Sequence, residues 1–453
     1  MAVWSTVNFQ DSVTYNRLDA EFFQPEFLAN DVLLKEQVSS SLGDLSKDMR
    51  YGLNVPPDYS KDGLPFVRAM NLKEGGIEGE ILNIPFKPEE VGSVNLLSEG
   101  DVLIVRSGAN VGDVGIITED QKGWTFGSYV IRCRVRNVDP FFLCIFLLSL
   151  PGRLQTVRYR SGAAQPNISI PNLREITVPL VSEILQQQVR NIFKLSISAR
   201  QKAKQSMAEA EAILTAALGL AKLDVSPRLS YEGMLSEVSD CGRLDAEFFQ
   251  PKYEHLLQHM QKTGQAARLG DFLHEPAKRG LQPVYDEKGT VAVINSQHVG
   301  PHYIDLETNR KTSKTEAERN NRKSIVRKYD VLLNSTGYQT IGRAQALLEE
   351  IPAVVDSHVT ILRPKSPLDP VFLGVFLNAL PGFLQTERHW TGSSGQIELR
   401  LEPIEDYTVW LAPDDIQQKI RQQVENAHKA RQESRRLLDE AKRTVEAAIQ
   451  EGT

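Results

Sequence analysis

The stretch Arg17-Leu-Asp-Ala-Glu-Phe-Phe-Gln-Pro25 occurs a second time as Arg243-Leu-Asp-Ala-Glu-Phe-Phe-Gln-Pro251. Nine identical residues in a row do not recur by chance in a chain of this length. Shorter matches follow at nearly the same spacing: Gly43-Asp44 with Gly270-Asp271, Asp101-Val-Leu with Asp330-Val-Leu, Leu150-Pro-Gly with Leu380-Pro-Gly, Leu154-Gln-Thr with Leu384-Gln-Thr, and Gln186-Gln187 with Gln417-Gln418. The sequence therefore contains two colinear copies of one plan, which marks an internal repeat.

Each copy passes from the repeated lead-in through a mixed region into a long helical segment. Short apolar runs at Val102–Val105 and Val331–Leu333 predict strands, and the glycine-containing turns that follow them are typical of hairpins. Apolar segments at Pro140–Leu150 and Pro370–Leu380 predict helices that begin after Asp-Pro and stop at Pro-Gly.

The last part of each copy has a heptad pattern, in which apolar and small residues alternate at spacings of four and three. We call these positions the seam; they are Leu185, Val189, Ile192, Ser196, Ala199, Ala203, Ser206, Ala210, Ile213 and Ala217, and, 231 residues later, Ile416, Ile420, Gln423, Ala427, Ala430, Ser434, Leu437, Ala441, Thr444 and Ala448. Alanine and serine let two helices approach closely, so we expect the two helices to pack on each other within one chain. Pairing with a partner protein or with a second copy remains an alternative, because heptads do not name their partner.

These observations predict an α+β fold with an internal pseudo-two-fold repeat. We expect two mixed α/β domains, at 1–181 and 223–412, separated by two long antiparallel coiled-coil helices at 182–222 and 413–453. The segments 48–99 and 275–328 scarcely match each other, although the frame around them does. Two similar modules with divergent inserts suit a long ligand with two separated contact sites, such as duplex DNA.

Composition sets the general class of protein. The chain has 41% hydrophobic and 24% charged residues, as in soluble globular proteins, and a net charge of −6. It has no apolar run of membrane-spanning length and no signal-peptide pattern at its start, so we expect a cytoplasmic protein whose cysteines, Cys133, Cys144 and Cys241, are reduced. The segment Arg310–Lys328 is strongly basic, which fits a nucleic-acid contact or a solvated face.

The motifs of common catalytic and metal sites are absent from the sequence or incomplete in it. The sequence has no phosphate-binding loop of the Gly-x4-Gly-Lys-Ser/Thr type. His255 and His259 have the spacing of two metal ligands on a helix but lack the glutamate of the metalloprotease motif. We expect no catalytic residue and no metal site, and we expect the repeated nine residues to anchor the frame through their aromatic pairs and a local Arg–Asp pair.

Several phrases, taken in order, resemble the specificity subunits of Type I restriction-modification enzymes: Leu64-Pro-Phe-Val-Arg68, Glu99-Gly-Asp-Val-Leu-Ile-Val-Arg-Ser-Gly108, Gly162-Ala-Ala-Gln-Pro-Asn-Ile-Ser169, and Thr177-Val-Pro-Leu180 followed by Gln186-Gln187. The second copy departs from this pattern, because Gly395-Gln-Ile-Glu-Leu399 stands where Gln-x-Asn-Ile-Ser is expected. The departure affects the role expected of that loop and leaves the expected architecture unchanged.

The resemblance implies a division of labour. Each variable domain would recognise one half of a bipartite site in double-stranded DNA, and the helices would form a spacer that docks two methyltransferase subunits. A motor-nuclease subunit is a further implied partner, and a membrane is not. The chain itself would be non-catalytic and would bind no cofactor, with S-adenosylmethionine held by the partner subunit. The alternatives are a stand-alone nucleic-acid-binding defence or regulatory protein on the same frame, and a coiled-coil adaptor that binds no nucleic acid.

Phosphate contacts require cations and turn backbone, and base contacts require Arg, Asn, Gln or hydroxyl side chains. On these grounds we expect the following DNA-binding residues in the first domain: Arg50, Arg68, Arg106, Ser107, Asn110, Arg158, Arg160 and Gln165. In the second domain they are Lys311, Lys314, Arg322, Lys323, Asn334, Thr336, Tyr338, Gln339 and Arg388.

Overall fold

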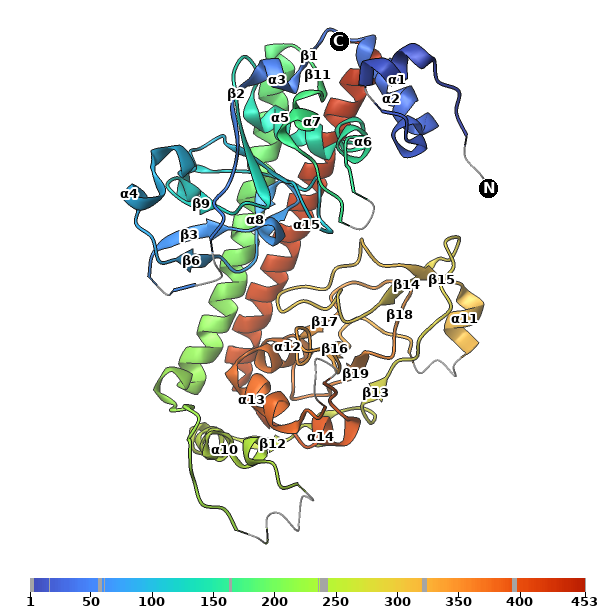
Figure 1. Cartoon of the computed structure of the whole chain (residues 1–453). Coiled ribbons are helices and arrows are strands. Elements are labelled where there is room, and N and C mark those ends of the chain that lie inside the picture. Colours follow the sequence, from blue (N-terminus) through green and yellow to red (C-terminus); the bar gives the residue numbers. More distant parts are fainter. Residues whose placement is uncertain are drawn as a thin grey trace. The chain divides into compact units, whose positions relative to one another are not determined.

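The computed structural model describes residues 4–15, 17–55, 59–60, 62–162, 165–234, 236, 243–319, 324–392 and 397–452. The chain divides into two compact units, which are coloured by sequence in Figure 1. Unit 1 combines Met1–Arg200 with Gln432–Thr453, and unit 2 is Gln201–Arg431. Each unit contains both sheets and helices, so the expected α+β class is confirmed.

Each unit is built on a four-stranded antiparallel sheet with the same strand order. In unit 1 the order is β2 (Ser46–Tyr51), β10 (Val130–Val135), β7 (Val102–Val105) and β8 (Val114–Ile116). In unit 2 it is β13 (Lys278–Arg279), β19 (Val359–Leu362), β16 (Val331–Asn334) and β17 (Ala344–Ala346). The strand β7 is apolar throughout because it is buried on both faces: Val102 and Ile104 join one core cluster, and Leu103 and Val105 join another.

A smaller three-stranded sheet accompanies each four-stranded sheet. Its central strand pairs antiparallel with one neighbour and parallel with the other in both units. The orders are β6 (Leu82–Ile84), β3 (Leu64–Val67), β9 (Thr125–Phe126) in unit 1 and β15 (Lys311–Thr312), β14 (Val291–Ile294), β18 (Ala353–Val355) in unit 2. The segments 48–99 and 275–328, whose sequences scarcely match, therefore share a strand topology. Unit 1 also has the hairpin β4 (Leu72–Lys73) and β5 (Gly76–Ile77).

Two consecutive helices follow each four-stranded sheet, and the first of the two packs on it. They are α5 (Pro140–Leu148) and α6 (Leu150–Arg158) in unit 1, and α12 (Pro370–Asn378) and α13 (Leu380–His389) in unit 2. The expectation that Leu-Pro-Gly stops the first helix is wrong in detail, because this tripeptide forms the first turn of the second helix. Proline is tolerated in the first turn because a backbone N–H there would have no hydrogen-bond partner within the helix. A Cβ atom on Gly152 would lie 2.1 Å from the carbonyl oxygen of Phe146, so the tight corner requires glycine.

The described ranges include no single helix with the length and apolar composition to cross a membrane. Helices α5 and α6 reach that length and composition only as a pair, across a bend of 73°. Nearly all of α5 is buried in the core of unit 1.

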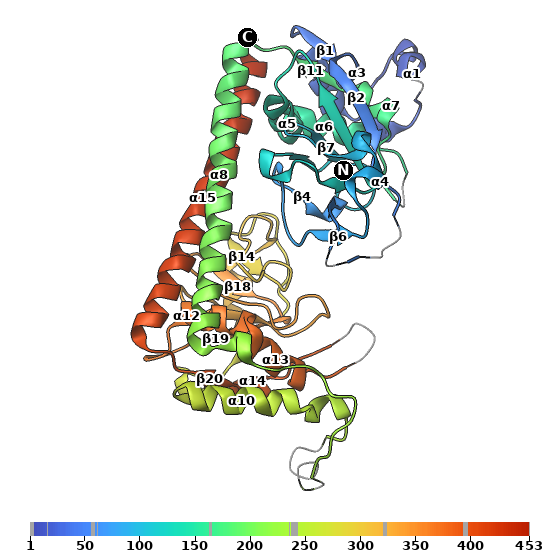
Figure 2. The ribbon, with the colours of Figure 1, turned by 90° about the vertical axis from the view of Figure 1, so that its left-hand side faces the viewer.

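The long helices are α8 (Glu183–Leu218) and α15 (Asp414–Glu451), which lie side by side in both Figure 1 and Figure 2. In unit 1 the buried hydroxyl of Ser196 donates to the carbonyl oxygen of Ser434 at 2.7 Å, with the two hydroxyl oxygens 3.2 Å apart. Unit 1 takes the first half of α8 and the second half of α15, and unit 2 takes the other halves, so the helices are antiparallel. Packing within one chain is thereby confirmed.

The buried faces of these helices are wider than the seam. Four further side chains on each helix are buried although they lie one position beyond a seam residue: Phe193, Met207, Leu214 and Leu218 on α8, and Val424, Leu438, Val445 and Ile449 on α15. They belong to the cores of the two units, together with residues of the sheets and shorter helices. Each long helix therefore packs against a globular core as well as against its partner helix.

The repeated glutamines fasten α8 and α15 to the shorter helices. The Oε1 atom of Gln186 accepts from the backbone N–H of Asp139 at 2.7 Å, and the Oε1 atom of Gln417 accepts from that of Asp369 at 2.8 Å. Each aspartate caps the N-terminus of a short helix, α5 or α12. The Gln-Gln match in the sequence thus reflects one structural joint made twice.

The nine-residue repeat has the anchoring role expected from the sequence. Arg17 pairs with Asp19 and lies over the ring of Phe22, and Arg243 pairs with Asp245 and lies over Phe248. The aromatic pairs Phe22–Phe23 and Phe248–Phe249 meet edge to face at 5.0 and 5.1 Å. Each repeat contains a short 3-10 helix, η1 (Ala20–Phe23) or η6 (Ala246–Phe249), and leads into α2 (Pro25–Lys35) or α10 (Pro251–Thr263).

Shorter elements complete the units. In unit 1 they are α1 (Phe9–Tyr15), β1 (Ser39–Ser41), α3 (Leu42–Leu45), η2 (Ala69–Asn71), α4 (Pro88–Val91), η3 (Ser93–Asn95), η4 (Glu119–Gln121), α7 (Ile170–Arg174) and β11 (Thr177–Pro179). In unit 2 they are η5 (Leu220–Lys222), β12 (Ala266–Arg268), η7 (Leu269–Phe272), α11 (Lys314–Arg319), α14 (Leu401–Glu405) and β20 (Thr408–Trp410).

Candidate nucleic-acid interface

One loop cluster occurs in both units. Among the site residues expected from the sequence, it contains Arg106, Ser107, Asn110 and Gln165 in unit 1 and Thr336, Tyr338 and Gln339 in unit 2. The loop after β7 is held by an isolated antiparallel bridge between Ser107 and Asn167, and the loop after β16 by the same bridge between Thr336 and Glu398. Gly108 and Gly337 follow the two bridge residues with φ values of 99° and 91°, a region that favours glycine. Glu398, which replaces the asparagine of the first copy, therefore occupies the same structural position as Asn167.

In unit 1 the cluster combines a cation with aromatic and amide groups. The guanidinium of Arg106 lies over the ring of Tyr51, 4.4 Å from its centroid, and has no acidic partner among the described residues. The amide of Gln165 donates to the hydroxyl of Ser107 at 3.4 Å. Asn110 is exposed at the tip of the same loop. A stacked arginine without a carboxylate partner can donate to a phosphate or to the edge of a base.

A second group of cations lies beside this loop. Burial and the nearby Arg153 lower the pKa of the Arg160 guanidinium, while Asp113 acts in the opposite direction. A Cβ atom on Gly112 would lie 3.2 Å from an Arg160 nitrogen, which places this guanidinium against the loop. Two arginines around one partly buried carboxyl leave an excess of positive charge, as a phosphate contact requires.

In unit 2 the equivalent cluster carries different side chains. The hydroxyl of Thr336 lies 2.7 Å from Nδ1 of His358. Tyr338 is 71% exposed, and Gln339 is exposed beside it. Arg279 forms an ion pair with Glu398, so this arginine is neutralised where Arg106 is not. The surface of unit 2 at this place is aromatic and hydrogen-bonding, with less free positive charge.

The remaining exposed or half-buried candidates lie in the divergent segments or beside them. Arg50 donates to Asp48 at 3.0 Å, and this arginine is the main cause that lowers the pKa of the carboxyl group. Arg68 lies 5.6 Å from the ring centroid of Tyr59 and donates to the carbonyl oxygen of Glu80. Lys311 lies on β15 and Lys314 at the start of α11; both are exposed.

Three candidates have structural roles inside the units. Arg158 is buried, pairs with Asp31 and lies 4.2 Å from the ring centroid of Phe22. Arg388 occupies the corresponding place in unit 2, 4.7 Å from the ring centroid of Phe248. Asn334 is fully buried and donates to the carbonyl oxygens of Ser296 and Val299. Arg158 and Asn334 thus offer no surface to a ligand, and Arg388 supports the lead-in. Arg322 and Lys323 lie outside the described residues.

Sequence reasoning missed four residues of the two clusters: Tyr51, Tyr129, Arg279 and His358. The strand register brings them to the loops, since Tyr51 stands opposite Ile131 and Arg279 opposite Thr360 at equivalent sheet positions. Tyr129 and His358 are the corresponding exposed residues that precede β10 and β19. Tyr129 and His358 stand at the same distance after the matched Asp-Val-Leu phrases, and this equal spacing is the signal that could have found them. The distances of Tyr51 and Arg279 before these phrases differ by one residue, so only the strand register brings this pair into correspondence.

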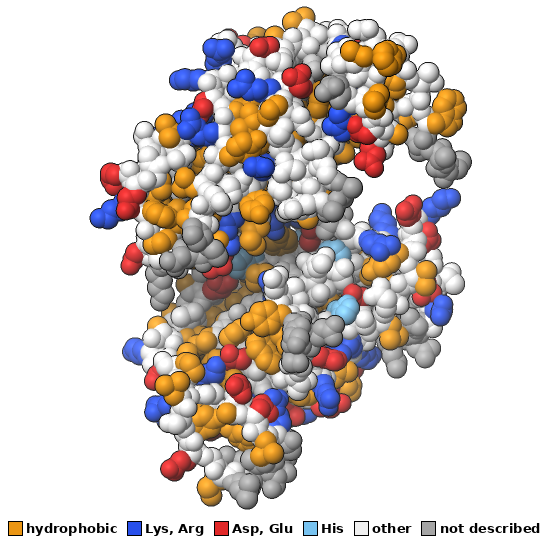
Figure 3. Space-filling model, in the orientation of Figure 1, with side chains coloured by type: hydrophobic (Ala, Val, Ile, Leu, Met, Phe, Trp, Pro, Cys, Tyr) orange, Lys and Arg blue, Asp and Glu red, His pale blue; other side chains and the backbone are white. Residues whose placement is uncertain are grey.

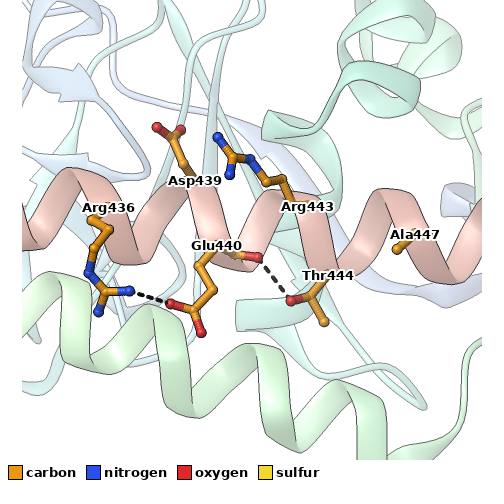
Figure 4. Close-up of a pocket in the computed structure, with 6 residues that line it drawn as sticks. All are labelled: Arg436, Asp439, Glu440, Arg443, Thr444 and Ala447. Carbon is orange, nitrogen blue, oxygen red and sulfur yellow. Dashed lines mark hydrogen bonds and ion pairs between the residues drawn. The ribbon is translucent and has the colours of Figure 1, made fainter.

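A hollow of about 490 Å³ lies elsewhere in unit 1, along α15 (Figure 4). Arg436, Asp439, Glu440, Arg443, Thr444 and Ala447 line it. Arg436 pairs with Glu440 and with Glu433 of the same helix, so much of the charge is satisfied locally. The hollow thus has the character of a helix surface, and its mixed charges do not favour a polyanion.

The described part of the chain has no group of three or more His, Cys, Asp or Glu residues placed to hold a metal ion. Nε2 of His259 lies 2.6 Å from the carbonyl oxygen of Leu218, so this ring has a structural partner. Cys133 and Cys144 are free and buried, and burial raises the pKa of both thiols. Cys241 lies outside the described residues.

No protein-family model and no curated protein matches this sequence. Among solved structures, the chain is similar to the S subunit of a Type-I restriction-modification system from M. genitalium, with a TM-score of 0.42 and 13% identity over 91% of this chain and 95% of that one. It is also similar to the HsdS subunit from Thermoanaerobacter tengcongensis, with a TM-score of 0.30 and 14% identity over 92% of this chain and 97% of that one. A third similar chain comes from a study of complex assembly and conformational transition of the type I R-M system, with a TM-score of 0.29 and 14% identity over 89% of this chain and 97% of that one. At these values the likeness concerns the general arrangement and assigns no role to any residue.

Proposed function

We propose that this chain is the DNA sequence-specificity subunit of a Type I restriction-modification complex. Each unit reads one part of a bipartite site in double-stranded DNA through the loop cluster described above. The chain is non-catalytic and docks methyltransferase subunits, which bring S-adenosylmethionine. Two kinds of observation support the proposal: the resemblance of the sequence phrases to this family, and the two loop clusters with their different side chains.

One observation carries the proposal: two copies of one frame present different side chains at equivalent positions. Tyr51 corresponds to Arg279 and Tyr129 to His358, while the position of Arg106 holds the buried Ser335, so unit 2 offers no cation there. The frame that supports these positions makes the same bonds in both units, including the one that Gln186 or Gln417 accepts from the backbone N–H of the capping aspartate. Two domains that recognise different DNA sequences require a common scaffold with different contact residues, and the two units have both.

The chemistry of each cluster fits contacts in a DNA groove. A guanidinium, an amide and hydroxyl groups are the donors and acceptors that distinguish base edges, and glycine turns bring backbone N–H groups close to phosphates. Unit 1 offers the free cation Arg106, and unit 2 offers Thr336, Tyr338 and His358. The two units therefore suit half-sites of different sequence.

The test combines methylation with one loop variant. The chain is produced together with a Type I methyltransferase subunit from the same genome, S-adenosylmethionine is added, and modified adenines are mapped by sequencing. We expect methylation at a split site, none from the chain alone, and a changed preference in only one half-site for Arg106→Ala. Asp62→Asn, an exposed change elsewhere in unit 1, is the matched control. Methyl transfer by the isolated chain would contradict the proposal, and sequence-specific DNA binding without any effect of a methyltransferase would favour a stand-alone DNA-binding protein.

A further inference from the structure

The nine-residue repeat contains side chains that the fold does not explain. Arg17, Asp19, Phe22 and Phe23 have partners within unit 1, and their counterparts in unit 2 make the same ion pair and ring contact. Leu18 and Leu244, in contrast, are 86% and 82% exposed. Packing among the residues that the structure describes gives no reason for an identical, solvent-facing leucine in both copies.

The glutamate of the repeat is equally unexplained. Glu21 and Glu247 are exposed, and their carboxylates form no ion pair and accept no hydrogen bond among the described residues. Ala20 and Ala246, between leucine and glutamate, are also exposed. The tetrapeptide Leu-Asp-Ala-Glu thus presents the same apolar and acidic surface in both units, although the two copies have diverged elsewhere.

We infer that this Leu-Asp-Ala-Glu surface is a protein-docking site used twice, once in each unit, by two copies of the same partner. Equal surfaces in two copies that read different ligands indicate a partner common to both units. An acidic, leucine-bearing surface repels the phosphates of DNA, so the complementary partner is a protein with an apolar pocket for the leucine beside a lysine or arginine for the glutamate.

The surroundings in unit 1 support a site of this kind. A hollow of about 510 Å³ adjoins the repeat, lined by Leu18, Ala20 and Phe23 together with Trp4 and Phe9. Trp4 and Phe9 are largely exposed, and Figure 3 shows hydrophobic side chains at the surface where α1 lies in Figure 1. Exposed aromatic side chains beside a hollow are typical of protein contacts.

The inference rests on the proposed function in one respect: it assigns the docking site to the methyltransferase subunit. The number of methyltransferase subunits bound to the full chain is therefore measured by native mass spectrometry, with DNA binding measured in parallel by fluorescence anisotropy. The variants are Leu18→Asp, Leu244→Asp and both together. Glu21→Lys and Glu247→Lys form a second pair that tests the charge. Val38→Asp and Val284→Asp are matched controls, because both valines are exposed and lie outside the repeat.

We expect two subunits on the unmodified chain, one on each single leucine variant and none on the double variant, with DNA affinity unchanged. Each lost site should weaken by at least about tenfold, as for removal of an anchor side chain. Two subunits on the double variant, or an equal loss in the valine controls, would overturn the docking site while leaving the proposed function intact. An unmodified chain that binds DNA but no methyltransferase would overturn the proposed function and, with it, the assigned partner.

Discussion

Arg134 holds Asp101 through two parallel hydrogen bonds, from Nε to Oδ1 at 2.6 Å and from NH2 to Oδ2 at 3.0 Å. Asp101 is buried, and it also accepts from the backbone N–H of Ser98. Arg363 holds Asp330 in the same manner in unit 2, at 2.8 and 3.1 Å. The matched Asp-Val-Leu phrase therefore marks an ion pair that fixes the strand before each loop cluster.

Replacing this carboxylate should destabilise unit 1. We expect Asp101→Asn to lower the free energy of unfolding by about 3 kcal/mol, because it leaves the charge of Arg134 without its buried partner. Asp330→Asn should cost less, since Arg363 keeps a second acid, Glu275. Urea unfolding measures both, with Asp62→Asn as an exposed control. Equal losses for the two buried aspartates would show that Glu275 does not compensate.

The Arg106 cation should contribute to affinity as well as to preference. We expect Arg106→Ala to weaken binding of the preferred DNA by about 1–3 kcal/mol, the range for a good arginine–base contact. Arg106→Lys keeps the positive charge but loses the planar guanidinium. Compared with Arg106→Ala, it should therefore recover more of the non-specific DNA affinity than of the preference for one half-site sequence. Anisotropy titrations on DNA with one half-site scrambled at a time measure the effect. If scrambling either half-site abolished the difference in DNA affinity between the variant and the unmodified chain, Arg106 would not be specific to one half-site.

His389 should make unit 2 sensitive to acid. Burial, and then Arg388 and Arg243, lower the pKa of this imidazole from 6.5 to about 4. Between these values the unfolded chain binds a proton that the folded chain does not, so stability falls as pH drops from about 6.5 towards 4, by roughly 2–3 kcal/mol. His389→Tyr, which introduces the residue found at the equivalent position in unit 1, Tyr159, should remove this dependence. Urea midpoints at pH 7 and pH 5 give the comparison, and an unchanged difference in the variant would assign the acid sensitivity to other groups.

The contact between Ser196 and Ser434 fixes the register of the long helices and thereby the positions for a length test. In this antiparallel register, Ala199 and Ala430 are at matching heights and are also repeat equivalents. Seven residues inserted after each should keep the seam in phase and lengthen each helix by about 10 Å. Under the proposed function the gap between half-sites should then grow by about 3 base pairs, with both half-sites unchanged.

Sequencing of methylated sites in the two-helix insertion variant measures this gap. Insertion of three residues at the same positions is the control, because it breaks the heptad phase and should destabilise the pair. An unlengthened gap at full activity would mean that the helices do not set the spacing.

Comparison of the two copies predicted much of the frame, and physical reasons account for the remainder. The strands at Val102 and Val331 and the packing of α8 on α15 follow from local patterns that the structure bears out. The buried Phe193 and Met207 were missed because a heptad describes contact with one partner, and these helices have two. The inward position of Arg158 was also missed, since its bond to the carbonyl oxygen of Phe22 spans 136 residues and no local pattern reports it.

The division of the long helices between the units has a consequence for synthesis on the ribosome. Unit 2 is one continuous segment, Gln201–Arg431, whereas unit 1 needs Gln432–Thr453 in addition to Met1–Arg200. Leu438, Ala441, Val445 and Ile449 all lie in the core of unit 1. Unit 1 is therefore completed last, although most of its residues are made first. The part of its core that the end of α15 covers stays exposed while more than 200 residues of unit 2 are translated.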